Sequence, residues 1–245
     1  MLPILQTLNA EARAAVGHTW AHRASSKAVA SLRLAALSNA LRAHQAPQDT
    51  VSVCHRSAIE AQKHAQACLK IAESFGQTVD IESVQRPGPL APATLTIEHR
   101  ILYELVAISC IQETLSGAVM GQVYQQAQYP PVKLTAHVIF KEGIWHSRLG
   151  WDFLGKVSQE GPITWLSVHL IELLELTADH ELRRGVLSGP DQPEKAAYGQ
   201  LSTAAAHRIF KDVINQVVLP GFESFGIDIE QGRMWFRAWA EENSP

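Results

Sequence analysis

Two short stretches of the chain repeat one arrangement of residues that could do chemistry. A glutamate stands four positions before a histidine in Glu60–His64 and again in Glu142–His146, and a small residue follows each histidine. Positions four apart share one face of an α-helix, so each pair presents both side chains in the same direction. Helical bundles build buried metal sites from Glu and His side chains on facing helices. The repeat therefore predicts a metal or acid–base centre between two helices.

The elements that must position these residues are helices. Apolar residues recur at helical spacing in six segments of the chain. These segments are about 9–44, 50–75, 95–128, 132–158, 163–182 and 202–217. No region alternates convincingly with period two, so we expect an all-α protein in which strands are minor or absent. Pro220 and Gly221 are expected to break the last helix and leave a short tail.

The order of the helices predicts how they are arranged. The first four form two hairpins, which a long irregular connection over about 78–94 joins, and each histidine of the repeat lies on the second helix of its hairpin. This order is typical of an up-down four-helix bundle with one long crossover. We expect the bundle to occupy residues 1–160. A C-terminal helical extension over 161–245 is expected to pack on it within a single globular unit.

Composition limits the partners and the compartment. The net charge of −3, with no cluster of Lys and Arg, excludes nucleic acid as an expected partner. No stretch reaches the roughly 20 apolar residues that a membrane span needs, so no membrane partner is expected. Cys54, Cys68 and Cys110 form no CxxC and are expected to be small core residues in a reducing, cytoplasmic compartment. The expected partner is a small-molecule substrate, and a homodimer is compatible with such a bundle.

The chain resembles the ferritin-like superfamily of di-iron carboxylate proteins, and most closely its bacterial ferritin-like domain proteins. Three stretches carry the resemblance. They are Ile59-Glu-Ala-Gln-Lys-His64-Ala, Cys110-Ile-Gln-Glu113-Thr and Lys141-Glu-Gly-Ile-Trp-His146-Ser-Arg-Leu-Gly-Trp151. The family's site takes one glutamate from each of two helices and a Glu-x-x-His from each of the other two. The resemblance implies that His64, His146 and Glu113 occupy ligand positions.

Three other ligand positions depart from the family's pattern. The positions three residues before each histidine hold Ala61 and Gly143, and no carboxylate occurs near Ser25, where the first helix should supply one. Glu60 and Glu142 lie one residue earlier than the family's ligands. There the family usually carries an acid that hydrogen-bonds a ligand histidine. Both glutamates could also turn inward and serve as ligands themselves.

The resemblance implies a remodelled central site with two classes of function. The first is an enzyme that uses iron, at a mononuclear or incomplete two-metal site, to oxidise a small organic molecule. The second is metal-free, either an acid–base catalyst that uses the retained histidines and glutamates or a non-catalytic binding scaffold. The candidate catalytic and metal-ligating residues are His64, His146, Glu113, Glu60 and Glu142.

Other polar and aromatic residues are expected to have structural positions. Lys27 could neutralise buried carboxylates where a cation is absent, but a lysine on a helix is usually exposed. His22 could replace the missing ligand of the first helix, but with His18 it is expected to face solvent or the end of the bundle. A solvated helix face is expected for His169, Glu172 and Glu175, and core positions for Trp145 and Trp151.

Overall fold

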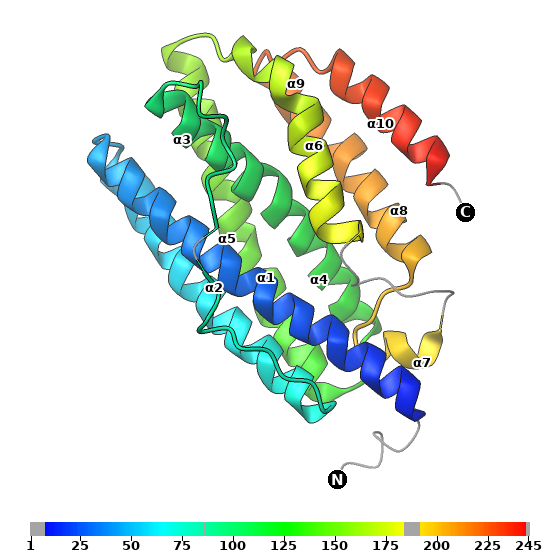
Figure 1. Ribbon diagram of the computed structural model, residues 1–245. Helices are drawn as coiled ribbons and strands as arrows, with labels where there is room; N and C mark the ends of the chain where they lie inside the picture. The colour runs from blue at the N-terminus through cyan, green and yellow to red at the C-terminus, as the bar shows by residue number, and fades with distance from the viewer. Residues whose placement is uncertain (1–7, 86, 184–191, 244–245) are drawn as a thin grey trace.

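The computed structural model describes residues 8–85, 87–183 and 192–243, and these residues form helices and connections without a β-strand. Four long helical segments lie side by side (Figure 1). They are α1 (Ala10–Ala43), α2 (Gln48–Ser74), a composite rod and α5 (Pro130–Glu160). The composite rod consists of α3 (Ile97–Leu105), the π-helical segment η2 (Val106–Glu113) and α4 (Thr114–Gln126). The expected all-α class is therefore confirmed for the described residues.

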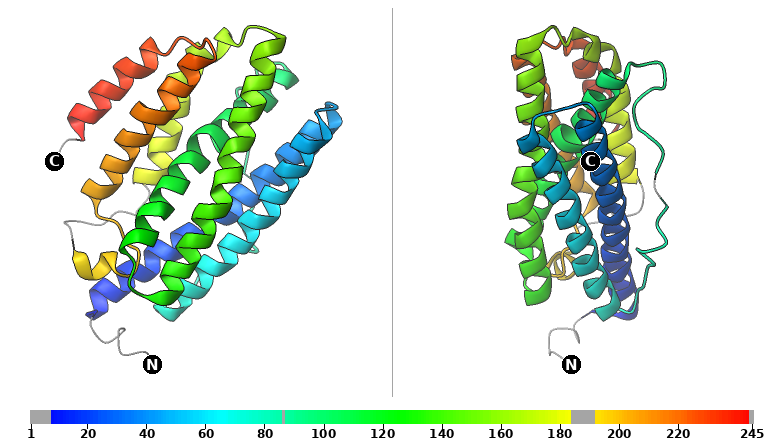
Figure 2. Two further views of the ribbon diagram at one scale, coloured as in Figure 1. Left: turned by 180° about the vertical axis from the view of Figure 1, so that it is seen from behind. Right: turned by 90° about the vertical axis from the view of Figure 1, so that its left-hand side faces the viewer.

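The C-terminal part of the chain adds a further layer of helices against the composite rod and α5 (Figure 2). Its elements are η3 (Thr164–His169), α6 (Leu170–Ala178), η4 (Asp179–Arg183), α7 (Pro193–Ala196), α8 (Thr203–Val213), η5 (Ile214–Val218), α9 (Leu219–Ser224) and α10 (Glu230–Glu242). One hydrophobic core joins this layer to the long helices, because Phe210, Phe222 and Trp239 belong to the same buried cluster as Trp20 of α1.

Local signals explain where the long helices begin and end. The Asn9 side chain accepts a hydrogen bond from the Ala12 amide at 2.8 Å and so caps α1. At the end of α2, Gly76 adopts φ = +81°, a conformation that favours glycine. The Gly76 and Gln77 amides then bond to carbonyls of the last helical turn, which closes the helix. Both ends agree with the sequence prediction.

The composite rod departs from the prediction of one regular helix over 95–128. Its middle turns, η2, have π-helical bonding and end at Glu113, the candidate ligand of this rod. A π turn rotates the residues that follow it relative to those that precede it, and such turns are frequent at functional sites. Sequence periodicity did not indicate this turn, because the bonding register of a helix depends on what packs against it.

The long connection between the two hairpins is anchored to the composite rod. It runs from α2 to α3 along the outside of α1 (Figure 2). The carboxylate of Glu104 accepts hydrogen bonds from the backbone amides of Leu90 and Ala91. The charged residue that interrupts the apolar stretch from Ile101 to Ile111 thus holds the crossover in place.

Two predictions for the C-terminal region were wrong. The chain does not leave the helix at Pro220, because the π turn of η5 places that proline in the first turn of α9, where its missing amide is tolerated. The expected tail is the helix α10, whose Phe236 and Trp239 are buried. The Trp239 ring packs 4.5 Å from the Phe210 ring, between ring centroids.

Two further expectations concern cysteines and membranes. Cys54, Cys68 and Cys110 are buried free thiols, as expected of small core residues. Among the described helices, none combines the length and the apolar character that a membrane crossing requires.

Candidate functional site

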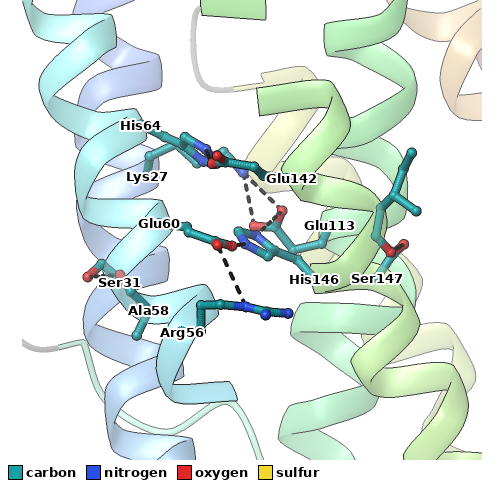
Figure 3. A network of polar contacts seen from close by, with 11 residues as sticks. Lys27, Ser31, Arg56, Ala58, Glu60, His64, Glu113, Glu142, His146 and Ser147 are labelled. Carbon is teal, nitrogen blue, oxygen red and sulfur yellow. Dashed lines mark hydrogen bonds and ion pairs between the residues drawn. The ribbon is translucent and has the colours of Figure 1, made fainter. Parts of the chain in front are cut away.

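The structure brings the five predicted site residues together in the space between α2, η2 and α5 (Figure 3). The side chains of His64, His146 and Glu113 are buried, whereas Glu60 and Glu142 reach partly into solvent. The two imidazole rings lie 5.8 Å apart between centroids. The repeat in the sequence therefore does place its histidines and glutamates at one site.

The two Glu-x3-His stretches pair crosswise. His146 Nε2 donates a hydrogen bond to Glu60 Oε2 at 2.9 Å, and His64 Nε2 donates to Glu142 Oε2 at 2.6 Å (Figure 3). Each glutamate thus bonds to the histidine of the other helix, and each pair bridges α2 and α5. Arg56, which is exposed, adds an ion pair of 3.7 Å to the outer oxygen of Glu60.

Lys27 of α1 is the main correction to the expected site. Its ammonium donates to both carboxylate oxygens of Glu113, at 2.9 Å and 3.1 Å. The side chains of the two residues are only 11% and 5% exposed, so the expectation of an exposed lysine was wrong. Lys27, and not Ser25, is the α1 residue that contacts Glu113, and the Ser25 hydroxyl donates a hydrogen bond to the Ala21 carbonyl within the helix. A lysine ammonium therefore occupies one side of the Glu113 carboxylate.

His146 connects this ion pair to Glu60. Its Nδ1 lies 3.4 Å from Glu113 Oε2, an ion-pair contact without hydrogen-bond geometry. Burial alone lowers the pKa of His146, but the contacts with Glu113 and Glu60 outweigh it and raise the pKa. Burial alone would raise the pKa of Glu113, but Lys27 and His146 hold it well below its usual range. Lys27, Glu113, His146 and Glu60 thus form a continuous row of ion-pair contacts.

The pKa of His64 is shifted in the opposite direction. Burial, together with the nearby positive charges of Lys27 and His146, lowers the pKa of His64 to about 3. The ring is therefore neutral near pH 7, with its proton on the Nε2 that bonds to Glu142. Its buried Nδ1 has no hydrogen-bond partner among the described residues.

The residues at the site do not fit the metal centre that the family resemblance implies. A metal held by Glu113 would lie against the Lys27 ammonium, and like charges at this distance repel strongly in a buried site. The Nε2 atoms of His64 and His146 are engaged by carboxylates, which leaves only their Nδ1 atoms, both without a hydrogen-bond partner among the described residues, as possible ligand atoms. Within the described part of the chain, no group of three or more His, Cys, Asp or Glu side chains is arranged to hold a metal ion.

Small residues leave room at one of the two altered positions. Ala61 is completely buried. A Cβ atom added to the buried Gly143 would meet nothing within 4 Å beyond its own helix and chain neighbours. Gly143 therefore borders unfilled space, because its missing side chain is not replaced there by another residue.

A small pocket lies on the α1 side of the Lys27–Glu113 pair. It has a volume of about 70 Å³, and Lys27 and Glu113 both form part of its wall. Arg23 and His22 of α1 line it as well, so the expectation that His22 faces solvent or the end of the bundle was wrong. Sequence reasoning missed Arg23, since an arginine in an amphipathic helix is usually exposed.

The other candidate residues lie away from the site. His169 is half-buried with its Nδ1 3.4 Å from Glu172 Oε2, while Glu172 and Glu175 are exposed, which agrees with a largely solvated face. Trp151 packs on Phe222, but Trp145 is 52% exposed, so its expected core position was wrong. His18 is exposed as expected.

The fold and the site define a helical protein with a largely buried network of paired charges beside a small pocket. Comparisons with protein-family models, curated proteins and solved structures find no match to the chain.

We expect His64→Gln to reduce the loss of stability in acid. A histidine kept neutral by the fold stabilises it above the unfolded pKa of 6.5, and this contribution is lost as pH falls toward the folded pKa of about 3. Urea unfolding should show that wild type loses roughly 2 kcal/mol more than the variant between about pH 7 and about pH 5. The contribution of His146 to stability depends on pH in the opposite sense. Wild type and variant both contain His146, so this contribution cancels when their losses are compared.

The exposed His18→Gln variant is the matched control and should follow wild type. Equal losses in wild type and His64→Gln would show that His64 is charged in the folded protein.

Proposed function

We propose that this chain is a metal-independent, non-catalytic binding protein of ferritin-like architecture that holds a small molecule beside Lys27. The bundle would keep the helices and the two histidines of the family, and a lysine–carboxylate pair would replace the metal centre. The single observation that carries the proposal is the contact of the Lys27 ammonium with both oxygens of Glu113.

The buried ammonium performs the electrostatic task that a cation would otherwise perform. It neutralises a carboxylate that has almost no contact with solvent. Removing one partner of a buried pair leaves an uncompensated charge, so Lys27 and Glu113 each need the other to remain buried and charged. This mutual neutralisation supports a site that is complete without metal.

The pKa shifts of Glu113 and His64 argue against acid–base catalysis by these two residues. An efficient general base has a pKa near the working pH. The pKa of Glu113 is held far below that range by Lys27 and His146, and burial lowers the pKa of His64 to about 3. Both groups are therefore weak bases, whereas the pocket beside them offers space for a ligand.

The metal arm of the test measures iron, manganese and zinc per chain after anaerobic loading. We expect wild type to bind far less than one metal per chain. Lys27→Glu should bind more, because it removes the ammonium and adds a carboxylate beside Glu113. Stoichiometric iron in wild type that disappears in the His64→Ala/His146→Ala double variant would overturn the proposal in favour of a metalloenzyme.

The ligand arm screens small polar compounds by ligand-detected NMR. Ser116, a half-buried residue of α4, lines the pocket, and Ser116→Phe should fill it and abolish binding. Gln125→Phe places the same side chain on an exposed position of α4 and should leave binding unchanged. Binding that survives Ser116→Phe would place the ligand elsewhere, and a screen without a single hit would contradict a binding function.

A further inference from the structure

The guanidinium group of Arg23 is buried, and the described residues give its two terminal nitrogens no hydrogen bond. Arg23 is 7% exposed, and its guanidinium carbon lies 4.6 Å from the centre of the Trp20 ring. Both Nη atoms are closed to solvent and have no hydrogen-bond partner among the described residues. A buried charge without hydrogen bonds costs several kcal/mol, so such a group is retained at a cost to stability.

The position of Arg23 links this cost to the pocket. Arg23 lines the pocket next to Lys27, which is four residues further along α1 and so on the same face. Burial lowers the pKa of Arg23 to about 10, which leaves the group charged at neutral pH. A turn of the guanidinium off Trp20 toward the pocket would expose two parallel N–H groups to a bound molecule. Two parallel N–H groups of an arginine can donate hydrogen bonds to both oxygens of one carboxylate, a bidentate contact.

The acidic residues of the pocket are both engaged. Glu113 is neutralised by Lys27, and Glu181 lies 3.8 Å from His180 Nε2. Burial raises the pKa of Glu181, and the charge of Glu113 adds to this, whereas the positive charges of the pocket, Arg23 among them, act in the opposite direction. Arg23 is therefore the lining cation whose Nη atoms have no carboxylate partner among the described residues.

The rest of the wall is partly apolar, and the space is small. Leu115, Val119, Met120 and Ile139 line it, together with polar residues that include Ser26, Gln112 and Ser116. A volume of about 70 Å³ is roughly half that of a cavity that holds benzene, so the enclosed part of a ligand has about three to five non-hydrogen atoms. A short aliphatic chain that ends in a carboxylate matches both the charge and the walls.

We infer that this pocket binds a short-chain aliphatic carboxylate, whose carboxylate group pairs with the Arg23 guanidinium. The inference rests on the proposed function in taking this pocket as the binding site, and it names the ligand class. Ligand binding would then supply the hydrogen-bond acceptors that the protein itself does not give Arg23.

The experiment measures binding of butyrate, butyramide and inorganic phosphate to the purified chain by calorimetry and NMR. Butyramide has the shape of butyrate without the charge, and phosphate has the charge without the apolar tail. We expect wild type to bind butyrate at least about tenfold more tightly than either control compound, the usual magnitude of a charge-assisted hydrogen bond.

Arg23→Met is the diagnostic variant, because methionine keeps the packing on Trp20 and removes the charge. Butyrate affinity should fall about tenfold or more, while the melting temperature of the ligand-free protein should stay equal or rise. Arg23→Lys keeps the charge without the fork and should also weaken butyrate binding, which provides a second variant should Arg23→Met fold poorly. Arg148→Met, at an exposed position of α5, is the control and should bind butyrate normally.

The outcomes separate the inference from the proposed function. Wild type could bind butyrate and butyramide equally, with binding lost in Ser116→Phe but kept in Arg23→Met. This result would overturn the carboxylate assignment but would still support a binding pocket. Tighter binding of phosphate than of butyrate would identify the ligand as an inorganic anion and would also overturn the inference. No binding of any of the three compounds to wild type would reject the ligand class, whereas only an empty broader screen would reject the binding function.

Discussion

Lys27→Met should lower the free energy of unfolding by about 3–5 kcal/mol, the usual effect of removing one partner of a buried ion pair. Methionine retains the length and most of the apolar contacts of the lysine side chain, so the loss reports the uncompensated charge of Glu113. Urea unfolding near neutral pH measures the effect. The exposed Lys63→Met variant of α2 is the matched control and should change stability by less than about 0.5 kcal/mol.

Two further measurements identify the cause of that loss. The deficit of Lys27→Met should shrink in acid, because the buried Glu113 then takes up a proton and no longer carries an unpaired charge. The double variant Lys27→Met/Glu113→Gln should recover most of the stability, since a neutral amide needs no counter-ion. A loss of less than about 1 kcal/mol in the single variant would mean that the ion pair contributes little.

The second large effect is expected from Gly150→Ala. Gly150 of α5 lies one turn beyond His146, where the helix approaches η2 closely. An added Cβ would come within 2.7 Å of Cys110 Sγ, 2.7 Å of Ser109 Cβ and 2.9 Å of the Cys110 backbone nitrogen. Backbone cannot move aside as a side chain can, so we expect a loss of about 2–3 kcal/mol.

The same substitution should disturb the site. Separating α5 from η2 lengthens the contact between His146 and Glu113, and NMR titration should therefore show the pKa of His146 falling toward its ordinary value. Gly143→Ala, two turns away on the same helix, is the matched control. Its Cβ meets open space, so this variant should gain about 0.5–1 kcal/mol from improved helix propensity. Equal effects of the two substitutions would contradict the close approach at Gly150.

The sequence predicts the helices well because their signals are local. Asn9 and Gly76 mark helix ends through their own side-chain and backbone chemistry, and the i, i+4 spacing places Glu60 and His64 on one face without knowledge of the fold. The C-terminal helix α10 also had a signal, since Gly232, Phe236 and Trp239 recur at helical spacing and are buried. The break expected at Pro220 obscured it.

What the sequence does not predict depends on contacts between helices. Burial of Lys27 and Arg23 reverses the usual preference of these residues for solvent, and only the carboxylate and the pocket that face them explain it. The crosswise pairing of the repeats depends on how α2 and α5 are rotated about their axes. The π turn that ends at Glu113 lies where α5 approaches it closely at Gly150, a contact that no local pattern in the sequence indicates.

The crosswise pairs give the site an approximate two-fold symmetry of contacts without a symmetry of charge. Exchange of the two hairpins would carry the Glu60–His146 pair onto the Glu142–His64 pair. Lys27 and Glu113 break this equivalence, since Glu113 contacts His146 and raises its pKa, whereas the charge of Lys27 helps burial to lower the pKa of His64. The repeated pattern of residues thereby gives two otherwise equivalent imidazoles whose pKa values are shifted in opposite directions.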